Sequence, residues 1–212
     1  ATRVDGGQVL FGDVVSTIEG QSRAILTGER VALNILQRLS GIATLTRRFV
    51  EAVEDTGTVI LDTRKTTPGL REMEKYAVRA GGGKNHRMNL TEMALIKENH
   101  ISAAGSITQA VDAVRAMHSV PVEVEVKNMD ELEEALACNV DMIMLDNWDL
   151  DSTRSAVVHV KKKVPLEASG NMNLKRVRDV ARTGVDYISV GALTHSYPAL
   201  DLSLLFEEAE HE

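Results

Sequence analysis

Cationic side chains gather where the sequence passes from short apolar runs into loops. In residues 61–71, Arg64 and Lys65 stand beside two threonines and a glycine. Arginine offers a planar fork of N–H donors, lysine a point charge and threonine a short donor, a combination that suits a carboxylate or a phosphate. A helix-entry loop with incidental charge is the alternative, but loops that follow strands form the active face of α/β barrels.

Two further segments extend this cationic set. Gly81–Gly83 precede the pair His86 and Arg87, and glycines let the backbone approach a ligand closely. Glycine-rich segments also occur in mobile linkers, so this signal is weak alone. Lys97 ends an apolar run, where a buried lysine without an anion would be costly. A solvated rim is the alternative for Lys97.

Two acids also end apolar runs, Glu125 in residues 122–126 and Asp146 after residues 142–145. Alternate side chains of a strand share a face, so Glu123 and Glu125 lie together, opposite the valines. A glutamate and an aspartate on neighbouring strand ends could hold Mg²⁺ together with phosphates. A helix cap is the alternative for Asp146 taken alone.

Small and hydroxyl residues follow the last two apolar runs, in residues 167–171 and 190–196. In (β/α) barrels the loops after the final strands commonly bind phosphate, partly through backbone N–H groups at helix N-termini. These two loops together predict a phosphate site.

The elements that must position these side chains alternate along the chain from about residue 57. Runs with β character cover 58–62, 94–97, 122–126, 142–145, 166–169 and 187–190, and helical patterns cover 70–80, 106–117, 130–137, 151–162 and 174–182. Repeated β–α order predicts a parallel sheet with right-handed connections. Six units favour an α/β fold of the TIM-like (β/α) barrel type, closed or nearly closed, over an open doubly wound sheet.

The segment before residue 57 has a different pattern. Residues 6–20 predict short strands broken by glycine turns, and residues 31–53 predict a long helix that starts at about Thr27. This pattern is typical of the end of a domain whose first part lies outside the sequence.

The composition narrows the class of protein and ligand. With 43% apolar and 26% charged residues among 212, an ordinary globular protein is expected, and no run approaches the roughly 20 apolar residues of a membrane span. A lone cysteine and no apolar leader favour the cytoplasm. The net charge of −7 disfavours nucleic acid, while residues 61–100 hold eight Lys/Arg against five Asp/Glu, a local +3 that suits a small polyanion.

From Thr27 to Phe206 the chain resembles the quinolinate phosphoribosyltransferases (nicotinate-nucleotide pyrophosphorylases, carboxylating), of the type II phosphoribosyltransferase family. The motifs that carry the resemblance are residues 28–34, 39–44, 62–66, 82–87, 145–147 and 167–170, with Lys97 and Glu125. It implies a transferase that moves phosphoribosyl from phosphoribosyl pyrophosphate (PRPP) to quinolinate and releases CO₂. The products would be nicotinate mononucleotide and pyrophosphate, in de novo NAD biosynthesis.

The resemblance also implies a homodimer whose sites, at the barrel mouths, are completed by the neighbouring subunit. Quinolinate would be held by Arg64, His86, Arg87 and Lys97, with Arg30 from the neighbour. Lys65, Glu125 and Asp146 would serve PRPP, the two acids with Mg²⁺, and these three with Lys97 form the predicted catalytic set. The 5-phosphate would lie on Ser169, Gly170, Asn171, Gly191 and His195.

The domain prediction follows the family. Residues 1–40 would be the C-terminal part of an N-terminal α/β sandwich domain, and residues 41–212 the barrel, with a last helix over 200–210 that packs back on the first domain. The family carries further N-terminal residues, which are expected to cover the neighbour's site.

Two other functions stay open at this point. A sister enzyme, such as a nicotinate phosphoribosyltransferase or the molybdenum-transport-linked homologue, would not need the full cluster for a second carboxylate. A non-catalytic truncated homologue would have no need of Glu125, Asp146 and Lys65.

Overall fold

The computed structural model describes residues 3–206, in which six parallel strands alternate with helices. The strands are β1 (Val59–Leu61), β2 (Ala94–Ile96), β3 (Val122–Val126), β4 (Met142–Asp146), β5 (Leu166–Ser169) and β6 (Tyr187–Ser189). The helices are α1 (Ser22–Val53), α2 (Arg71–Ala80), α3 (Glu98–Ala104), α4 (Ile107–Met117), α5 (Met129–Ala137), α6 (Leu150–Val160), α7 (Val177–Ala181) and α8 (Ala192–His195). All six predicted strands and all six predicted helices up to α7 are present, whereas the short α3 and α8 were not predicted from the sequence.

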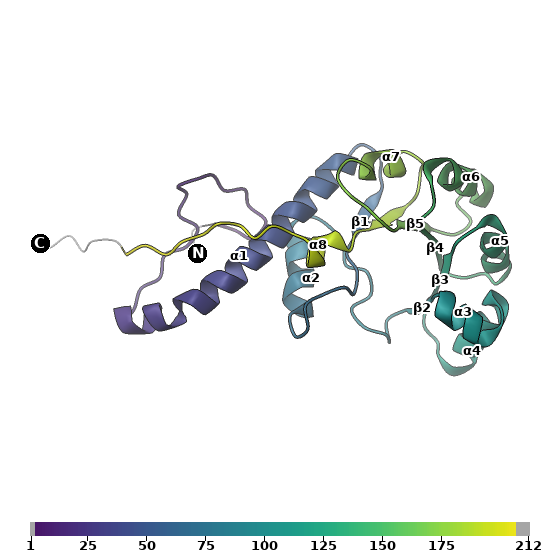
Figure 1. Ribbon diagram of the computed structural model, residues 1–212, viewed down its shortest axis with the longest axis horizontal. Helices are drawn as coiled ribbons and strands as arrows, with labels where there is room; N and C mark the ends of the chain where they lie inside the picture. The colour runs from purple at the N-terminus through teal and green to yellow at the C-terminus, as the bar shows by residue number, and fades with distance from the viewer. Residues whose placement is uncertain (1–2, 207–212) are drawn as a thin grey trace, which may run out of the picture.

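The strands form one curved sheet in the order β1-β6-β5-β4-β3-β2, with helices on its outer side (Figure 1). Within the described residues β1 and β2 do not pair, so the barrel is open between them. Lys84 takes the free edge of β1: its N–H donates to Ile60 O at 2.9 Å, and its carbonyl accepts from Asp62 N at 3.1 Å. The prediction of a TIM-like, nearly closed barrel is confirmed.

The two faces of β3 show how the sheet is stabilised. Val122, Val124 and Val126 are buried against the outer helices, and fully burying such a side chain contributes about 1.5–3 kcal/mol. Glu123 and Glu125 alternate with them on the inward face. The barrel interior therefore carries acids where the outer layer carries the apolar core.

Side-chain caps fix where three outer helices begin. Ser106 accepts from Gln109 N at 3.1 Å at the start of α4. Asn128 caps α5 and Asp149 caps α6 in the same way, at 2.9 and 2.7 Å. Each cap satisfies an N–H that the first turn leaves unpaired, and each is worth about 1 kcal/mol.

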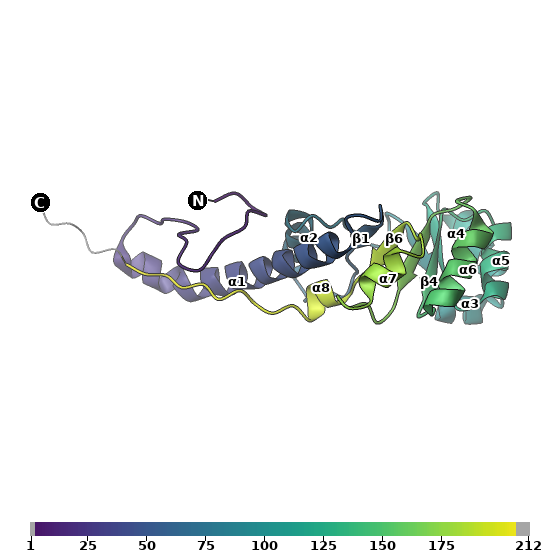
Figure 2. The same cartoon turned by 90° about the horizontal axis from the view of Figure 1, so that it is seen from above.

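Helix α1 is longer than predicted, because it begins at Ser22 and continues through residue 40, the predicted domain boundary. Its first half extends away from the barrel, and its second half packs on α2, β1 and α7 (Figures 1 and 2). No strand forms in residues 6–20, so the prediction of short strands there is wrong. The glycine turns are present, with φ of 77° at Gly6 and 87° at Gly12, but a strand needs a partner and no described segment supplies one.

The chain after α8 runs back along α1 as an extended segment (Figure 2). Leu200 N donates to Gln37 O at 3.0 Å, and Gln37 Nε2 donates to Leu202 O at 2.7 Å. The prediction of a helix over 200–210 is therefore wrong for residues 200–206, because their backbone groups form hydrogen bonds with α1. Residues 207–210 lie outside the described residues. Packing against the first 40 residues is as predicted.

A buried carboxylate joins β1, α2 and the segment that fills the open side. Lys75 Nζ lies 2.5 Å from Asp62 Oδ1, and neither side chain is exposed. Asn85 Nδ2 and His86 N donate to Asp62 at 2.6 and 2.8 Å. Burial raises the pKa of Asp62 and lowers the pKa of Lys75, while their mutual attraction opposes both shifts. The pair is stabilising only while both partners are present.

No helix in the described part of the chain combines the length and apolarity that crossing a bilayer requires.

Replacing Asp62 should therefore be costly. We expect Asp62→Ala to lower the free energy of unfolding by about 3–5 kcal/mol, because it leaves Lys75 buried without a partner. The exposed pair Arg178–Asp55 is the matched control, and Asp55→Ala should cost less than about 1 kcal/mol. Urea denaturation measures both, and equal losses would contradict this account of Asp62.

Candidate active site

Arg64 and Arg87 are near enough for their charges to repel, and neither forms an ion pair with a described residue. Arg64 comes three residues after β1, and Arg87 three residues after Lys84, which fills the open side of the barrel. Burial and the charge of Arg64 both lower the pKa of Arg87, although a guanidinium stays charged. Arg87 Nη1 donates to Met93 O at 2.9 Å, and Arg64 Nε is buried without an acceptor among the described residues. Two adjacent cations with an unused donor form a site for an anion with more than one charge.

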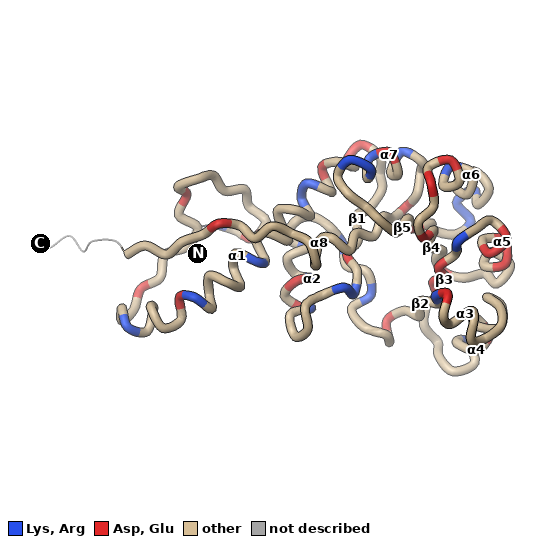
Figure 3. Tube along the Cα trace, in the orientation of Figure 1, with Lys and Arg blue, Asp and Glu red and all other residues tan. Residues whose placement is uncertain are grey.

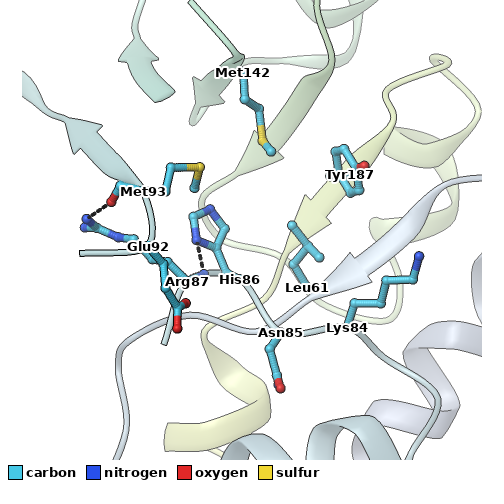
Figure 4. Close-up of a pocket in the computed structure, with 9 residues that line it drawn as sticks. All are labelled: Leu61, Lys84, Asn85, His86, Arg87, Glu92, Met93, Met142 and Tyr187. Atoms are coloured by element: carbon cyan, nitrogen blue, oxygen red, sulfur yellow. Dashed lines mark hydrogen bonds between the residues drawn. The ribbon is translucent and has the colours of Figure 1, made fainter. Parts of the chain in front are cut away.

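His86 precedes Arg87, and its two ring nitrogens have different surroundings. Nδ1 accepts from Arg87 N at 2.8 Å, the contact drawn in Figure 4. Nε2 lies 3.0 Å from Glu123 Oε2 and 3.2 Å from Glu167 Oε2, outside hydrogen-bond angles. In this arrangement neither nitrogen faces a ligand, which differs from the predicted contact of His86 with quinolinate.

Burial and the charge of Glu167 raise the pKa of Glu123 to about 7. Burial lowers the pKa of His86, but the two carboxylates outweigh it and raise that pKa to about 10. An imidazolium would, however, turn an N–H toward the N–H of Arg87, which the observed contact excludes. We therefore take the His86 ring as neutral and Glu123, whose pKa is raised, as the group that holds the additional proton.

The predicted mouth acids stand on the inward faces of β3 and β4. Glu125 is opposite Met144, and Asp146 is two residues further along β4, so both point to the same side of the sheet. Lys97 Nζ contacts Glu125 Oε2, and Asn147 Nδ2 donates to Asp146 at 2.9 Å. The structure thus brings Lys97, Glu125 and Asp146 together at the carboxyl ends of the strands.

The loops after β4 and β5 are fastened to each other. Asn171 Nδ2 donates to Asn147 Oδ1 at 3.0 Å, and Asn147 N donates to Ser169 O at 2.9 Å. Gly170 has φ of 94°, and a Cβ there would lie 2.1 Å from Asn147 Oδ1, so only glycine fits. Asn171 is also left-handed, with φ of 50°. Successive turns of this kind expose backbone N–H groups to an anion.

A cationic cavity of about 300 Å³ lies between the loop after β1 and α8. It is lined by Arg38, Lys65, Thr66, Thr67, Thr194, His195 and Tyr197. Thr194 Oγ1 donates to Lys65 O at 2.8 Å, and a Cβ on Gly191 would lie 3.0 Å from His195 Nε2 and 3.3 Å from Lys65 Cδ. Lys65, Gly191 and His195, which the sequence predicts to contact PRPP, therefore lie together. Hydroxyl and cationic donors of this kind fit phosphate.

A second cavity, of about 340 Å³, opens on the other side of His86. It is lined by Leu61, Lys84, Asn85, His86, Arg87, Glu92, Met93, Met142 and Tyr187 (Figure 4). Met142 and Tyr187 begin β4 and β6, so this cavity reaches the amino ends of the strands, away from Glu125 and Asp146. We assign the chemistry to the carboxyl ends, where the acids and the left-handed loops lie.

Charge is divided across the barrel. In Figure 3, Lys and Arg occur on the loops beside β1 and α2, and Asp and Glu occur along β3 and β4 opposite them. A ligand between the two sides would meet cations on one and acids on the other.

Arg30 is placed apart from these residues. It is exposed in the third turn of α1 and forms no hydrogen bond or ion pair with the described chain. The predicted helix start at about Thr27 is therefore wrong, because α1 begins at Ser22, and Arg30 lies inside the first half of this helix.

Three site residues were not predicted from the sequence. Arg38 Nε donates to Glu74 at 3.1 Å, contacts Thr67, and lies 5.3 Å from the centre of the Tyr197 ring. Glu123 and Glu167 form the layer beneath the mouth. The alternation of residues 122–126 predicted that Glu123 lies on the same face as Glu125. Nothing in the sequence predicted the contact of Glu123 with His86.

The fold and the site together define an open parallel α/β barrel with an anion-binding mouth. The family description "Quinolinate phosphoribosyl transferase, C-terminal domain" matches residues 42–205, and the N-terminal domain of the same family matches residues 2–40. The chain therefore belongs to the quinolinate phosphoribosyl transferase family, which confirms the resemblance found in the sequence.

Named relatives agree with this assignment. The chain is 49% identical over 205 residues to a probable nicotinate-nucleotide pyrophosphorylase (carboxylating) from Synechocystis, covering 94% of this chain and 70% of that protein. Identity to the Bacillus subtilis protein of the same name is 48%, with the same coverage. The crystal structure of NadC from Streptococcus pyogenes superposes with a TM-score of 0.89 at 46% identity, over 94% of this chain and 71% of that one.

The buried carboxyl pair predicts how stability depends on pH. Since the pKa of Glu123 is raised from 4.5 to about 7, the folded chain binds more protons than the unfolded chain between these values. The free energy of unfolding should fall by about 3 kcal/mol as pH rises through this window, relative to Glu123→Gln, which cannot titrate there. Urea titrations of both proteins from about pH 5 to about pH 8 test this. A difference that does not change with pH would contradict the buried pair.

Proposed function

We propose that this chain transfers the phosphoribosyl group of PRPP to quinolinate with loss of CO₂, giving nicotinate mononucleotide and pyrophosphate. The observation that supports this most is the pair Arg64 and Arg87, whose charges repel and which form no direct ion pair with a described residue. A pyridine with two carboxylates supplies the two negative charges that such a pair would balance.

Quinolinate would lie between the arginines and the mouth acids. Each guanidinium would hold a carboxylate with paired N–H donors, and Lys97 would add a third cation. Fixing the ring in this way aims its nitrogen at the ribose carbon and screens the repulsion between two anionic substrates. This converts an encounter of two anions into a reaction within one complex.

PRPP would be held from the opposite loops. Lys65 and His195 line the 300 Å³ cavity with three threonines, and these groups suit its phosphates. The left-handed loop of Gly170 and Asn171 offers backbone donors beside them. As pyrophosphate leaves, positive charge develops on the ribose ring, and the carboxylates of Glu125 and Asp146 would stabilise it.

Glu125 and Asp146 also fit a magnesium ion that accompanies PRPP. Their carboxylate oxygens on neighbouring strand ends match the hard donors that Mg²⁺ prefers. The ion, when bound, would neutralise charge on the leaving pyrophosphate. In the structure Lys97 contacts Glu125, so a cation already occupies part of this position.

Loss of CO₂ follows from the product of transfer. Once the pyridine nitrogen carries the ribose it is cationic, and it stabilises the carbanion left when the adjacent carboxylate departs. The chain's contribution is to hold the second carboxylate and to keep the ring fixed.

We further infer that two copies of the chain form each site. Arg30 is exposed on the half of α1 that extends from the barrel, and apolar Leu26, Val31 and Leu36 on the same helix are exposed at 55%, 65% and 43%. Exposed apolar side chains around this half of the helix, beside an unpaired cation, suit contact with a second barrel, which would receive Arg30 at its quinolinate.

The substrate assignment is tested by comparing two pyridine acids. We expect kcat/KM for quinolinate, measured by CO₂ release with PRPP, to exceed that for nicotinate, measured by mononucleotide formation, by at least about 100-fold, because the site would leave cations unpaired with one carboxylate. Arg64→Lys should narrow the gap. Comparable values would favour a nicotinate-specific sister enzyme.

The shared site is tested by mixing subunits. Arg30→Ala and Lys65→Ala should each be nearly inactive, because one removes a contact to quinolinate and the other a contact to PRPP. After exchange, random pairing should restore up to about a quarter of the wild-type activity per site, since half the dimers then hold one intact site. If exchange is confirmed and no activity returns, Arg30 does not act across an interface.

A further inference from the structure

Two buried acids have no part in the proposed chemistry. Glu123 and Glu167 come from β3 and β5, face the barrel interior, and have no exposed surface. Their four carboxylate oxygens accept no hydrogen bond within the described chain. Burying even one unpaired carboxylate costs several kcal/mol, so a pair must be compensated by protons, cations or a metal.

A metal ion is the first possibility. His86, Glu123 and Glu167 each offer a ligand atom, and these atoms lie within 4.8 Å of one another. However, Nδ1 of His86 accepts a hydrogen bond from Arg87 N, so the ring proton must be on Nε2. Nε2 is the nitrogen that faces the carboxylates and that a metal would require. The tautomer therefore favours protons over a metal.

The proton of the His86 ring can then be assigned. It lies on Nε2, which is 3.0 Å from Glu123 Oε2 and 3.2 Å from Glu167 Oε2. Glu123 and Arg87 also attract each other. This attraction acts without a direct ion pair that would block the donors of Arg87.

These contacts hold three consecutive residues, Asn85, His86 and Arg87, in place. Asn85 and the backbone N–H of His86 are held by Asp62, and the backbone N–H of Arg87 is held by the His86 ring. The ring in turn is oriented by the two glutamates. Asp62 thus holds Asn85 and the backbone of His86, and the two glutamates, through the His86 ring, hold the backbone of Arg87.

We propose that Glu123 and Glu167 are positioning residues for the quinolinate side of the site: they orient the His86 ring through Nε2–H and thereby set Arg87 beside Arg64. This inference rests on the proposed function for the identity of the ligand. The two acids cannot touch substrate, since neither side chain is exposed. Their loss should therefore affect one substrate and not the other.

The test compares isosteric and apolar replacements. Glutamine keeps the shape of the side chain and an oxygen that faces Nε2–H, so Glu167→Gln should keep quinolinate KM within about twofold, whereas Glu167→Leu should raise it about tenfold, as for one lost polar contact. KM for PRPP should stay unchanged in both. Glu125→Gln is the contrasting variant, because it removes a mouth acid and should act on kcat and PRPP instead.

A second measurement needs no substrate and remains valid if Glu167→Leu fails to fold. Long-range ¹H–¹⁵N spectra of the wild-type protein should show His86, assigned by comparison with His86→Asn, as the Nε2–H tautomer at neutral pH. An Nδ1–H tautomer, or stoichiometric Zn²⁺ or Mn²⁺ binding by calorimetry that Glu167→Gln abolishes, would overturn the proposal in favour of a metal site. An unchanged quinolinate KM in folded Glu167→Leu would overturn the positioning role. Absence of quinolinate turnover in wild type would overturn the proposed function alone, since the tautomer is read independently.

Discussion

The buried contact between Asp62 and Lys75 decides where three parts of the chain meet. Asp62 directly follows β1, Lys75 comes from α2, and the same carboxylate accepts hydrogen bonds from Asn85 and from the backbone N–H of His86. A six-stranded barrel that does not close leaves backbone groups at β1 unpaired, and Lys84 pairs with Ile60 O and Asp62 N there. The segment that repairs the open side of the barrel is thus also the segment that carries His86 and Arg87. Fold and site depend on one buried ion pair.

This arrangement explains how cations can be concentrated without being neutralised. Arg87 is held by the His86 ring and by the carbonyl of Met93, and Glu123 and Glu167 lie next to that ring. The acids Glu125 and Asp146 stand across the mouth, where a ribose would develop positive charge. A dicarboxylate would therefore face the arginines on one side of the barrel, and the ribose of a phosphorylated sugar would face the acids on the other side.

The sequence predicted the barrel well because its strands are short apolar runs closed by polar residues, a pattern that local chemistry fixes. Lys97, Glu125, Asp146 and the loop at Gly170 were found for the same reason, since each ends a strand. The tail and the N-terminal segment were mispredicted because their backbone partners are not local: Leu200 bonds to Gln37, and residues 6–20 lack a partner strand. The contact of Glu123 and Glu167 with His86 depends on the register of three separate segments, which periodicity in one strand cannot give.

The most direct test of this account is a crystal structure of the protein with bound quinolinate. We expect its two carboxylates within hydrogen-bond distance of Arg64 and Arg87, its ring nitrogen facing the side of Glu125 and Asp146, and His86 still in contact with Arg87 N. Quinolinate bound elsewhere, or bound with only one carboxylate in contact with an arginine, would contradict the central claim that the adjacent arginines form the dicarboxylate site.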